Sequence, residues 1–513
     1  MAQAHPPAIE LIHIDKKFGA VHANRDINLS VAKGTIHGII GENGAGKSTL
    51  MSILYGFYHA DSGEIKVNGK PAHIRTSQDA ITAGIGMVHQ HFMLVENFSV
   101  LENIILGVEG GALLKGGEDK ARARLKQLAD EYELDVDPDQ LIEDLPVGLQ
   151  QRVEILKALT RGAETLILDE PTGVLTPAEA DHLFRILHIL KDQGKTIMLI
   201  THKLREIMAV TDNVSVMRRG EMVATRKTSE TSPQELAELM VGRRVLLEVD
   251  KGPAKPGKEM LRVEGLTVRD EWKVARVDNV SFNVRAGEIV GIAGVSGNGQ
   301  SELLAALAGI RKAVSGKIIV DGETIDPAHE ADPAKMRDRG VAHVPEDRHH
   351  MGLVLPFEES ENSILGYHES NAYGSGIMLD PEAVRADAAI KVRKFDIRPD
   401  NVRLKTANFS GGNQQKIVLA REMERDPKIL LVGQPTRGVD IGAIEFIHKR
   451  LISMRDAGKA ILLVSVELDE IRSLSDRVLV MFAGRIVGEV SPETDEGEIG
   501  LLMAGIERKD AAE

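Results

Sequence analysis

The chain alternates short runs rich in apolar residues with longer segments in which apolar residues recur every three or four positions. The runs 35–40, 165–168 and 196–200 are typical of strands buried on both faces of a parallel sheet. The segments 150–159 and 178–190 have the periodicity of helices. Strands and helices that alternate in this way predict an α/β fold in which crossover helices join parallel strands.

This pattern occurs twice along the chain. Residues 34–41 (GTIHGIIG) resemble 287–294 (GEIVGIAG), and 62–69 (SGEIKVNG) resemble 315–322 (SGKIIVDG), in both cases 253 residues later. Further on, EPT at 170–172 corresponds to QPT at 434–436, which is 264 residues later. A repeat of this length predicts a duplicated domain.

A polar stretch rich in Pro and Gly, KGPAKPGK at 251–258, separates the two copies. Such a composition is typical of a linker. We therefore expect a first domain at 1–246, a linker at 247–259 and a second domain at 260–513.

A candidate phosphate-binding loop follows the first of these strands. Residues 41–48 (GENGAGKS) fit the pattern G-x-x-x-x-G-K-[ST] between a strand and a helix. Glycines allow backbone N–H groups to surround phosphate oxygens, Lys47 adds positive charge, and the Ser48 hydroxyl can bind Mg²⁺. The alternative, a glycine-rich turn that binds nothing, is disfavoured by the strand–loop–helix context. The candidate phosphate-binding residues of this loop are Gly41, Glu42, Asn43, Gly44, Ala45, Gly46, Lys47, Ser48 and Thr49.

Two carboxylates end another apolar strand. Asp169 can hold Mg²⁺, and Glu170 can orient or deprotonate an attacking water. His202 follows the strand 196–200 and is expected at the same edge of the sheet. The alternatives are an acidic strand end that caps the next helix, and a surface histidine.

Composition excludes several classes of protein. The chain has no cysteine, which excludes disulfide scaffolds, cysteine-ligated zinc and iron–sulfur clusters. Its net charge of −14 argues against a broad nucleic-acid surface. No apolar run approaches the roughly 18 to 20 residues that span a bilayer, and the start, MAQAHPP, does not resemble a signal peptide. We therefore expect a soluble intracellular protein that reaches a membrane through a partner.

With these motifs in this order, the chain resembles the ATP-binding subunits of ABC transporters, twice and over nearly its full length. The resemblance implies two tandem P-loop nucleotide-binding domains, each with a helical subdomain, arranged as an intramolecular head-to-tail pseudo-dimer. It implies ATP and Mg²⁺ as ligands and each ATP site as shared between the two halves.

The resemblance also implies roles for single residues. In the first half, Phe18 is expected to stack on adenine, with core packing as the alternative, and Gln90 is expected to contact Mg²⁺ and assist catalysis with Glu170 and His202. The second half is expected to complete this site with its signature sequence. The residues involved are Ser410, Gly411, Gly412, Asn413 and Asp440.

The second half departs from the family pattern at its own Walker motifs, which are the counterparts of the phosphate loop 41–48 and of the strand end at 169–170. Gln300 replaces Lys47, and Gln434 replaces Glu170, so a charge and a general base are lost. In the first half, by contrast, the signature has Pro146, which offers neither a hydroxyl nor an N–H. We predict one hydrolytic site and one degenerate site that binds nucleotide weakly or only holds the two halves together. The residues of the degenerate site are Gly294, Gly297, Gly299, Gln300, Ser301, Glu346, Gly433, Gln434, Val466, Pro146 and Gly148.

The resemblance implies an ATPase that powers a membrane importer. Tandem domains with a degenerate second half are similar to importers of simple sugars and nucleosides, and the segments 86–95 and 344–349 favour nucleosides. Simple sugars of the ribose, galactose or xylose type are the alternative. A soluble translation-factor ATPase is a remote alternative, because the linker is short and the second site is impaired.

The implied partners are integral-membrane permease subunits and, through them, a solute-binding protein. A second copy of this chain is a further candidate partner, and no nucleic acid is expected. The expected location is peripheral, on the cytoplasmic face of the cell membrane.

Overall fold

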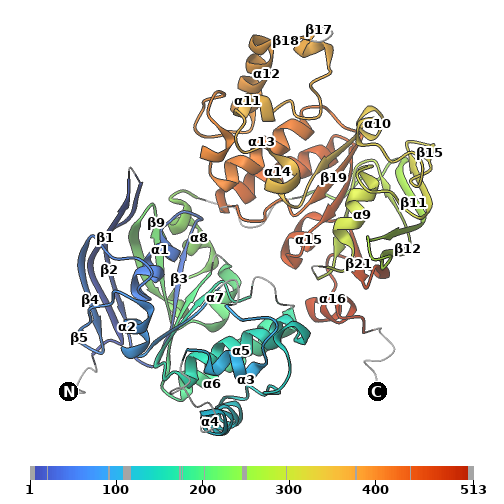
Figure 1. The fold of residues 1–513 in the computed structure, drawn as a ribbon. Helices are drawn as coiled ribbons and strands as arrows, with labels where there is room; N and C mark the ends of the chain where they lie inside the picture. Colours follow the sequence, from blue (N-terminus) through green and yellow to red (C-terminus); the bar gives the residue numbers. More distant parts are fainter. Residues whose placement is uncertain are drawn as a thin grey trace. The chain divides into compact units, whose positions relative to one another are not determined.

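The chain forms two compact units, which divide between Val245 and Leu246 (Figure 1). We describe them from a computed structural model, and each unit is described by itself. The described residues are 6–19, 21–89, 93–107, 117–172, 175, 177–201, 203–244, 251–295, 297–375, 378–439 and 441–506.

The first unit contains an antiparallel sheet of four strands and a mainly parallel sheet of six. The four-stranded sheet has the order β2 (Val21–Val31), β1 (Ile9–Phe18), β4 (Ser62–Val67), β5 (Lys70–Pro71). The six-stranded sheet has the order β10 (Glu221–Lys227), β9 (Asn213–Arg218), β3 (Ile36–Gly41), β8 (Thr196–Ile200), β7 (Thr165–Asp169), β6 (Ile85–Val88), and only the pair β9–β10 in it is antiparallel. Its helices are α1 (Lys47–Leu54), α2 (Ser77–Thr82), α3 (Val100–Ile105), α4 (Gly117–Tyr132), α5 (Val147–Thr160), α6 (Pro177–Asp192), α7 (Leu204–Val210) and α8 (Pro233–Val241).

The second unit repeats this plan. Its four-stranded sheet has the order β12 (Ala275–Arg285), β11 (Glu259–Arg269), β14 (Ser315–Val320), β15 (Glu323–Ile325). Its six-stranded sheet has the order β16 (Val341–Val344), β19 (Ile429–Gly433), β20 (Ala460–Val464), β13 (Glu288–Ala293), β21 (Arg477–Phe482), β22 (Arg485–Val490), and a small extra pair is formed by β17 (Gly374–Ser375) and β18 (Met378–Leu379). Its helices are α9 (Gln300–Leu307), α10 (Pro333–Asp338), α11 (Glu359–Asn362), α12 (Pro381–Lys394), α13 (Gly411–Met423), α14 (Ile441–Asp456), α15 (Leu468–Leu474) and α16 (Glu496–Met503).

The predicted α/β class is confirmed, and so are the elements expected from the apolar pattern. The predicted strands correspond to β3, β7 and β8, and the two predicted helices correspond to α5 and α6. The duplication is visible in the strand order, since β6, β7, β8, β3 and β9 in the first unit match β16, β19, β20, β13 and β21 in the second.

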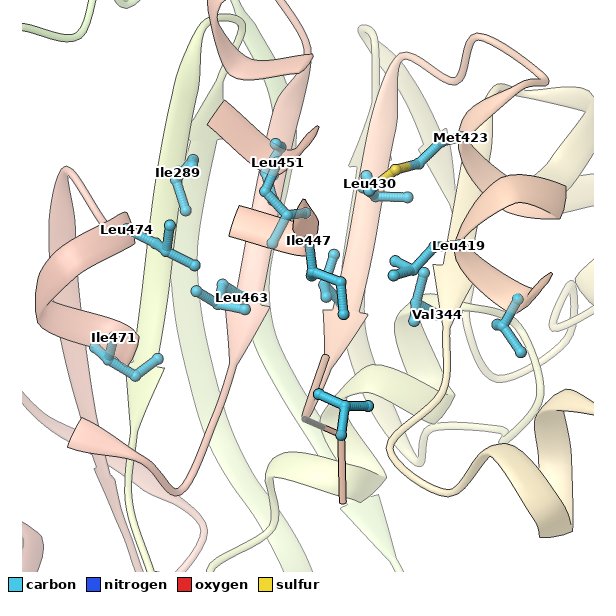
Figure 2. Packing of buried hydrophobic residues seen from close by; sticks show 14 of the residues in the cluster. Ile289, Val344, Leu419, Met423, Leu430, Ile447, Leu451, Leu463, Ile471 and Leu474 are labelled. Atoms are coloured by element: carbon cyan, nitrogen blue, oxygen red, sulfur yellow. The ribbon is translucent and has the colours of Figure 1, made fainter. Parts of the chain in front are cut away.

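Side chains of the central strands alternate between two cores. In β19, Leu430 and Val432 pack in a core with α13, α14 and α15, which Figure 2 shows from close by. Ile429 and Leu431 point to the opposite core, which also holds α9 and residues of the antiparallel sheet. Both faces of the strand are therefore covered, which explains why these strands are apolar without alternation.

The segment between the two units is partly docked. In residues 251–258 the structure contains neither a helix nor a strand. Arg455 donates a hydrogen bond to the Gly252 carbonyl at 2.9 Å, and the Gly257 N–H donates to the Ala286 carbonyl at 2.7 Å. This part of the chain therefore belongs physically to the second unit.

Among the residues that the structure describes, no helix has both the length and the apolar character needed to cross a bilayer.

Candidate nucleotide-binding sites

The first-half loop between β3 and α1 has the backbone shape that its glycines allow. Gly44 and Gly46 have left-handed φ angles of 80° and 99°. A Cβ at Gly46 would overlap the Ala23 carbonyl oxygen and lie 2.8 Å from Nδ2 of Asn24. Asn24 in turn donates a hydrogen bond to the Gly46 carbonyl at 3.0 Å. Asn24 therefore fixes the loop, a role that its isolated position in the sequence does not reveal.

Lys47 is held across this loop. It is the first residue of α1, is only 6% exposed, and donates hydrogen bonds to the carbonyls of Gly41 at 2.7 Å and Glu42 at 3.1 Å. Burial lowers the pKa of the ammonium group, and the negative charges of Glu170 and Asp169 oppose this shift. The structure therefore brings the charge of Lys47 within electrostatic reach of both carboxylates.

Asp169 and Glu170 lie at the carboxyl end of β7. Burial, followed by the charge of Glu170, raises the pKa of Asp169 to about 6, while Lys47 lowers it. Glu170 has a left-handed φ of 46°, and its N–H donates to the Ile200 carbonyl of β8 at 2.8 Å. This backbone turn fixes the direction in which the chain leaves the strand, directly beside the Asp169 carboxylate.

The donor set of the first half fits Mg²⁺. Ser48, in the first turn of α1, offers a hydroxyl, and Asp169 offers a carboxylate that is costly to keep charged without a cation, since it is buried beside Glu170. Oxygen ligands of this kind are those that Mg²⁺ prefers.

Phe18 lies at the end of β1 and is 43% exposed, so it is not a core residue. Its ring makes an edge-to-face contact with Tyr58 at 5.2 Å between centroids, and Nζ of Lys16 lies 5.3 Å from its centroid. The sequence had not singled out Tyr58, which comes from a loop after α1. In the second unit the corresponding turn between β11 and β12 carries Trp272, which is 81% exposed.

The second-half loop keeps the shape of the first. Gly297 and Gly299 have φ angles of 90° and 100°, close to those of their first-half counterparts. Gln300 is 5% exposed, and its amide nitrogen donates to the Val295 carbonyl at 3.2 Å. Val295 stands where Glu42 stands in the first half, so Gln300 makes one of the two hydrogen bonds of Lys47 without the charge.

The end of β19 differs more strongly. Gly433 has no side chain, and a Cβ there would lie 2.5 Å from Cγ of Glu346. Glu346 accepts a hydrogen bond from the Ser301 hydroxyl. Burial raises the pKa of Glu346, and the Ser301 hydrogen bond opposes this shift.

Gln434 has the same backbone geometry as Glu170. Its φ is 46°, and its N–H donates to the Val464 carbonyl at 2.8 Å. Its side-chain oxygen accepts a hydrogen bond from the Val466 N–H at 3.3 Å. The amide therefore fills the position of the acid without its ability to accept a proton.

The two signature segments begin equivalent helices. Ser410 is the N-cap of α13, is exposed, and its hydroxyl accepts a hydrogen bond from Asn413 at 2.9 Å. Pro146 is the N-cap of α5. Gly148 lies in the first turn of α5, where a Cβ would come within 2.8 Å of a Glu179 carboxylate oxygen.

Arg348, which the sequence did not indicate as a site residue, lies against Gly411 of the second-half signature segment. Arg348 donates to the Arg437 carbonyl at 2.8 Å, and a Cβ at Gly411 would lie 2.7 Å from its guanidinium. Gly412 follows in the same helical turn and is buried. Arg348 lies on the segment after β16, and this segment is close to the start of α13 only in the folded chain. No local sequence pattern could therefore have identified Arg348.

Three predicted residues, Gln90, His202 and Asp440, lie outside the described residues, and their roles stay predictions.

Comparisons with known proteins identify the same family in both halves of the chain. A family model described as "ABC transporter" matches residues 24–173 and again 277–437. The chain is 48% identical to the guanosine import ATP-binding protein NupO of Bacillus subtilis, with 98% of each chain covered. It is 47% identical to the nucleoside import ATP-binding protein NupA of Lactococcus lactis, with 98% of this chain and 99% of the relative covered. It is 45% identical to the glucose import ATP-binding protein TsgD13 of Haloferax volcanii, with 97% and 96% covered.

Proposed function

This chain belongs to the ABC transporter family, and from that premise we propose that it hydrolyses ATP to power a membrane importer of nucleosides. The observation that carries the proposal is that Lys47, at the end of the first-half glycine loop, interacts electrostatically with Asp169 and Glu170 at the end of β7. The nucleoside class is supported by two relatives that cover almost the whole chain and whose names specify guanosine and nucleosides.

In the first half, each residue has a distinct task in the proposal. Lys47 attracts the outer phosphates of ATP, and Phe18 stacks on adenine. Ser48 and Asp169 hold Mg²⁺, which when bound neutralises charge on the phosphate oxygens. Glu170 orients the attacking water and accepts its proton as the bond to the γ-phosphate breaks, giving ADP and phosphate.

Gln90 and His202 are proposed to assist at the γ-phosphate. Ser410, Gly411, Gly412, Asn413 and Asp440 of the second half are proposed to complete this site, as the resemblance implies for the family. Support comes from the chemistry of the two signatures, since Ser410 offers a hydroxyl where Pro146 offers none.

The second half is proposed to bind nucleotide without hydrolysing it. Gln434 accepts no proton, and Gln300 carries no charge toward phosphate, although both keep the backbone positions of their first-half counterparts. The loop shape needed for phosphate is present, and the group needed to activate water is replaced.

The proposed partners are permease subunits in the membrane, a solute-binding protein that acts through them, and a second copy of this chain. The proposed place is peripheral, on the cytoplasmic face of the membrane. ATP is the nucleotide that the family binds, and Mg²⁺ is proposed with it.

A second candidate substrate class is simple sugars, because a relative at 45% identity is named as a glucose importer. The test is uptake of radiolabelled guanosine, uridine, glucose and ribose by cells in which the gene has been deleted and then restored as the native chain or as Glu170→Gln. Loss of nucleoside uptake in the deletion and in Glu170→Gln supports the proposal. Loss of sugar uptake alone shows that the substrate class is wrong, and unchanged uptake of all four solutes contradicts the importer role for these classes.

A further inference from the structure

One arginine of the second half joins two segments that are far apart in the sequence. Arg348 begins the short helical turn Arg348–Gly352, which follows β16. Its guanidinium donates a hydrogen bond from Nη1 to the Arg437 carbonyl at 2.8 Å. Its Nη2 lies 2.7 Å from where a Cβ at Gly411 would be, and 3.5 Å from where a Cβ at Gly438 would be. The guanidinium therefore lies against both the first turn of α13 and the segment that follows β19.

The residues beside Arg348 fix the turn that carries it. Asp347 accepts a hydrogen bond from the N–H of His349 at 2.8 Å, at the start of this turn. The His349 ring donates from Nε2 to the side-chain oxygen of Gln414 at 2.7 Å. Gln414 is only 6% exposed and donates in turn to the Thr406 carbonyl at 3.1 Å. The backbone around Arg348 is therefore tied to the first turns of α13 independently of the guanidinium.

Two glycines leave room for the guanidinium. A Cβ at Gly411 would come within 2.7 Å of it and within 2.9 Å of the Gly438 carbonyl oxygen, so a larger residue there cannot coexist with Arg348 in its present position. Gly438 has a left-handed φ of 66°, which glycine adopts without strain. Both positions therefore need glycine while the guanidinium lies beside them.

The first half has different residues at the three matching positions. At the 264-residue offset of the later part of the repeat, Val147 and Val174 stand at the positions of the two glycines. At the 256-residue offset of the segments after β6 and β16, Phe92 stands at the position of Arg348. An arginine with two glycines in one half thus corresponds to a phenylalanine with two valines in the other. The second half therefore has the guanidinium together with the space that it needs, on three separate segments.

The charge of Arg348 lies where helix stability alone would not place it. Gly411 is the first residue of α13, and the amino end of a helix carries partial positive charge, which favours acidic neighbours over basic ones. Burial lowers the pKa of the guanidinium, the charge of Asp347 opposes this shift, and the charge of Arg437 adds to it. A charged group held here at an electrostatic cost is better explained by the arrangement that it imposes on its neighbours.

We propose that Arg348 is a positioning residue for ATP hydrolysis at the first site. It holds the second-half signature residues 410–413 against the segment that leads to Asp440, so that both meet the γ-phosphate in one fixed arrangement. This rests on the proposed function, in which these second-half residues complete the site that contains Glu170. A residue of the second unit thus controls the rate of a reaction whose general base belongs to the first.

The first measurement is steady-state ATP turnover of the full chain assembled with its permease. Arg348→Gln removes the charge and the fork of donors and keeps a polar side chain. We expect kcat to fall by about 10- to 100-fold, the scale associated with misplacing a reacting group by roughly 1 Å. KM for ATP should change less than about threefold, because the first-half loop with Lys47 is untouched. The melting temperature should stay nearly constant, since Arg437 is exposed and water can reach its carbonyl.

A second measurement reports the geometry itself. The turn after β19 contains a hydrogen bond from the Val439 N–H to the Thr436 carbonyl at 3.2 Å. Arg348→Gln should accelerate hydrogen–deuterium exchange in a peptide that covers 434–439, because this turn loses its contact with the guanidinium. Exchange in β20 should be unchanged.

Arg472→Gln is the matched control. Arg472, in α15, is partly buried like Arg348, and its guanidinium also donates to a backbone carbonyl, that of Pro492 at 3.0 Å. The control loses the same type of contact in the same unit, and it should keep native turnover and native exchange in 434–439. Glu170→Gln in the same assay is the reference for a chain that cannot hydrolyse ATP.

The outcomes separate this role from the proposed function. If Glu170→Gln hydrolyses ATP as fast as the native chain, the proposed function fails and the role of Arg348 fails with it. If Glu170→Gln is inactive and Arg348→Gln keeps native kcat, or raises only KM, the function stands and the positioning role is overturned. The role is also overturned if Arg348→Gln and Arg472→Gln lose turnover and melting temperature alike, because Arg348 then contributes only to packing.

Discussion

Lys47 and Gln300 occupy equivalent places in two loops of nearly the same shape, and they differ in charge. Both are buried, and both donate a hydrogen bond to a carbonyl of their own loop. The second half therefore demonstrates that a glutamine fits this position without disturbing the backbone. Replacing Lys47 with glutamine should therefore remove the charge and keep the shape of the loop.

Lys47→Gln is expected to leave the melting temperature of the chain nearly unchanged and to weaken ATP binding at the first site. A unit charge near phosphate is worth about 4 kcal/mol at an effective dielectric constant near 20, and a neutral hydrogen bond retains about 1 kcal/mol. The difference corresponds to an affinity loss of roughly 100-fold. Calorimetric titration of the native chain and the variant measures it. An affinity loss below a few-fold contradicts the electrostatic role of Lys47.

At the scale of the element, the phosphate loop depends on two glycines for different reasons. Gly44 and Gly46 both have left-handed φ angles, but only Gly46 lies against backbone atoms. Around Gly44, no described atom lies within 4 Å of where a Cβ would be. Gly46 is therefore required because a side chain would clash with neighbouring backbone, whereas Gly44 is required only for its left-handed φ.

Gly46→Ala is therefore expected to distort the loop, lower the free energy of unfolding of the first unit and abolish ATP binding there. Gly44→Ala pays only the left-handed penalty of about 1 to 2 kcal/mol and should keep measurable binding. Urea unfolding and ATP titration of both variants test this contrast. Equal losses in the two variants would show that contact with Ala23 does not matter.

The helical region of the second unit contains a buried carboxyl group with a pH-dependent effect on stability. Glu359, at the start of α11, is fully buried and accepts a hydrogen bond from the Ser363 hydroxyl at 2.6 Å. Burial raises its pKa from 4.5 to about 7, against the lowering effects of Ser363 and Lys391. The folded state therefore binds this proton more tightly than the unfolded state does.

Because the folded pKa is raised, the contribution of Glu359 to stability is fully present below about pH 4.5 and is lost as the pH rises toward 7. Glu359→Gln removes this dependence. Relative to the native chain, the variant should gain about 3 kcal/mol in unfolding free energy between pH 4.5 and pH 8. Urea unfolding of the second unit across this range measures the difference. A pH-independent difference contradicts the shift.

The elements that the sequence predicted are those whose signal is local. The continuous apolar runs that form β3, β7 and β8 can be recognised in the sequence because almost every residue of these strands is buried. The loop at 41–48 is readable because its glycine spacing is a local requirement of the backbone. By contrast, the contacts of Asn24 with Gly46 and of Glu346 with Ser301 join segments that are distant in the sequence. No local pattern encodes such contacts, so the sequence named Glu346 only as a substitution.

At the scale of the whole molecule, the chain combines two units of the same plan with unequal chemistry. The first unit has an acid at the end of β7, and the second has an amide with the same φ of 46° at the end of β19. Both units therefore share the backbone conformation at this position, but only the first has a side chain that can act as a general base. ATP turnover should accordingly depend on one unit.

Glu170→Gln is expected to reduce ATP turnover of the chain assembled with its permease by roughly 10²- to 10⁴-fold, the range associated with loss of a general base. The change keeps the size of the side chain, and Gln434 shows that an amide is accommodated in this geometry. Gln434→Ala should change turnover less than about twofold, since this amide takes no part in proton transfer. Phosphate release measured for both variants at saturating ATP decides the matter, and melting temperatures check folding. Comparable losses in the two variants would contradict the dependence of ATP turnover on one unit, because the second-half amide would then be as necessary as the first-half acid.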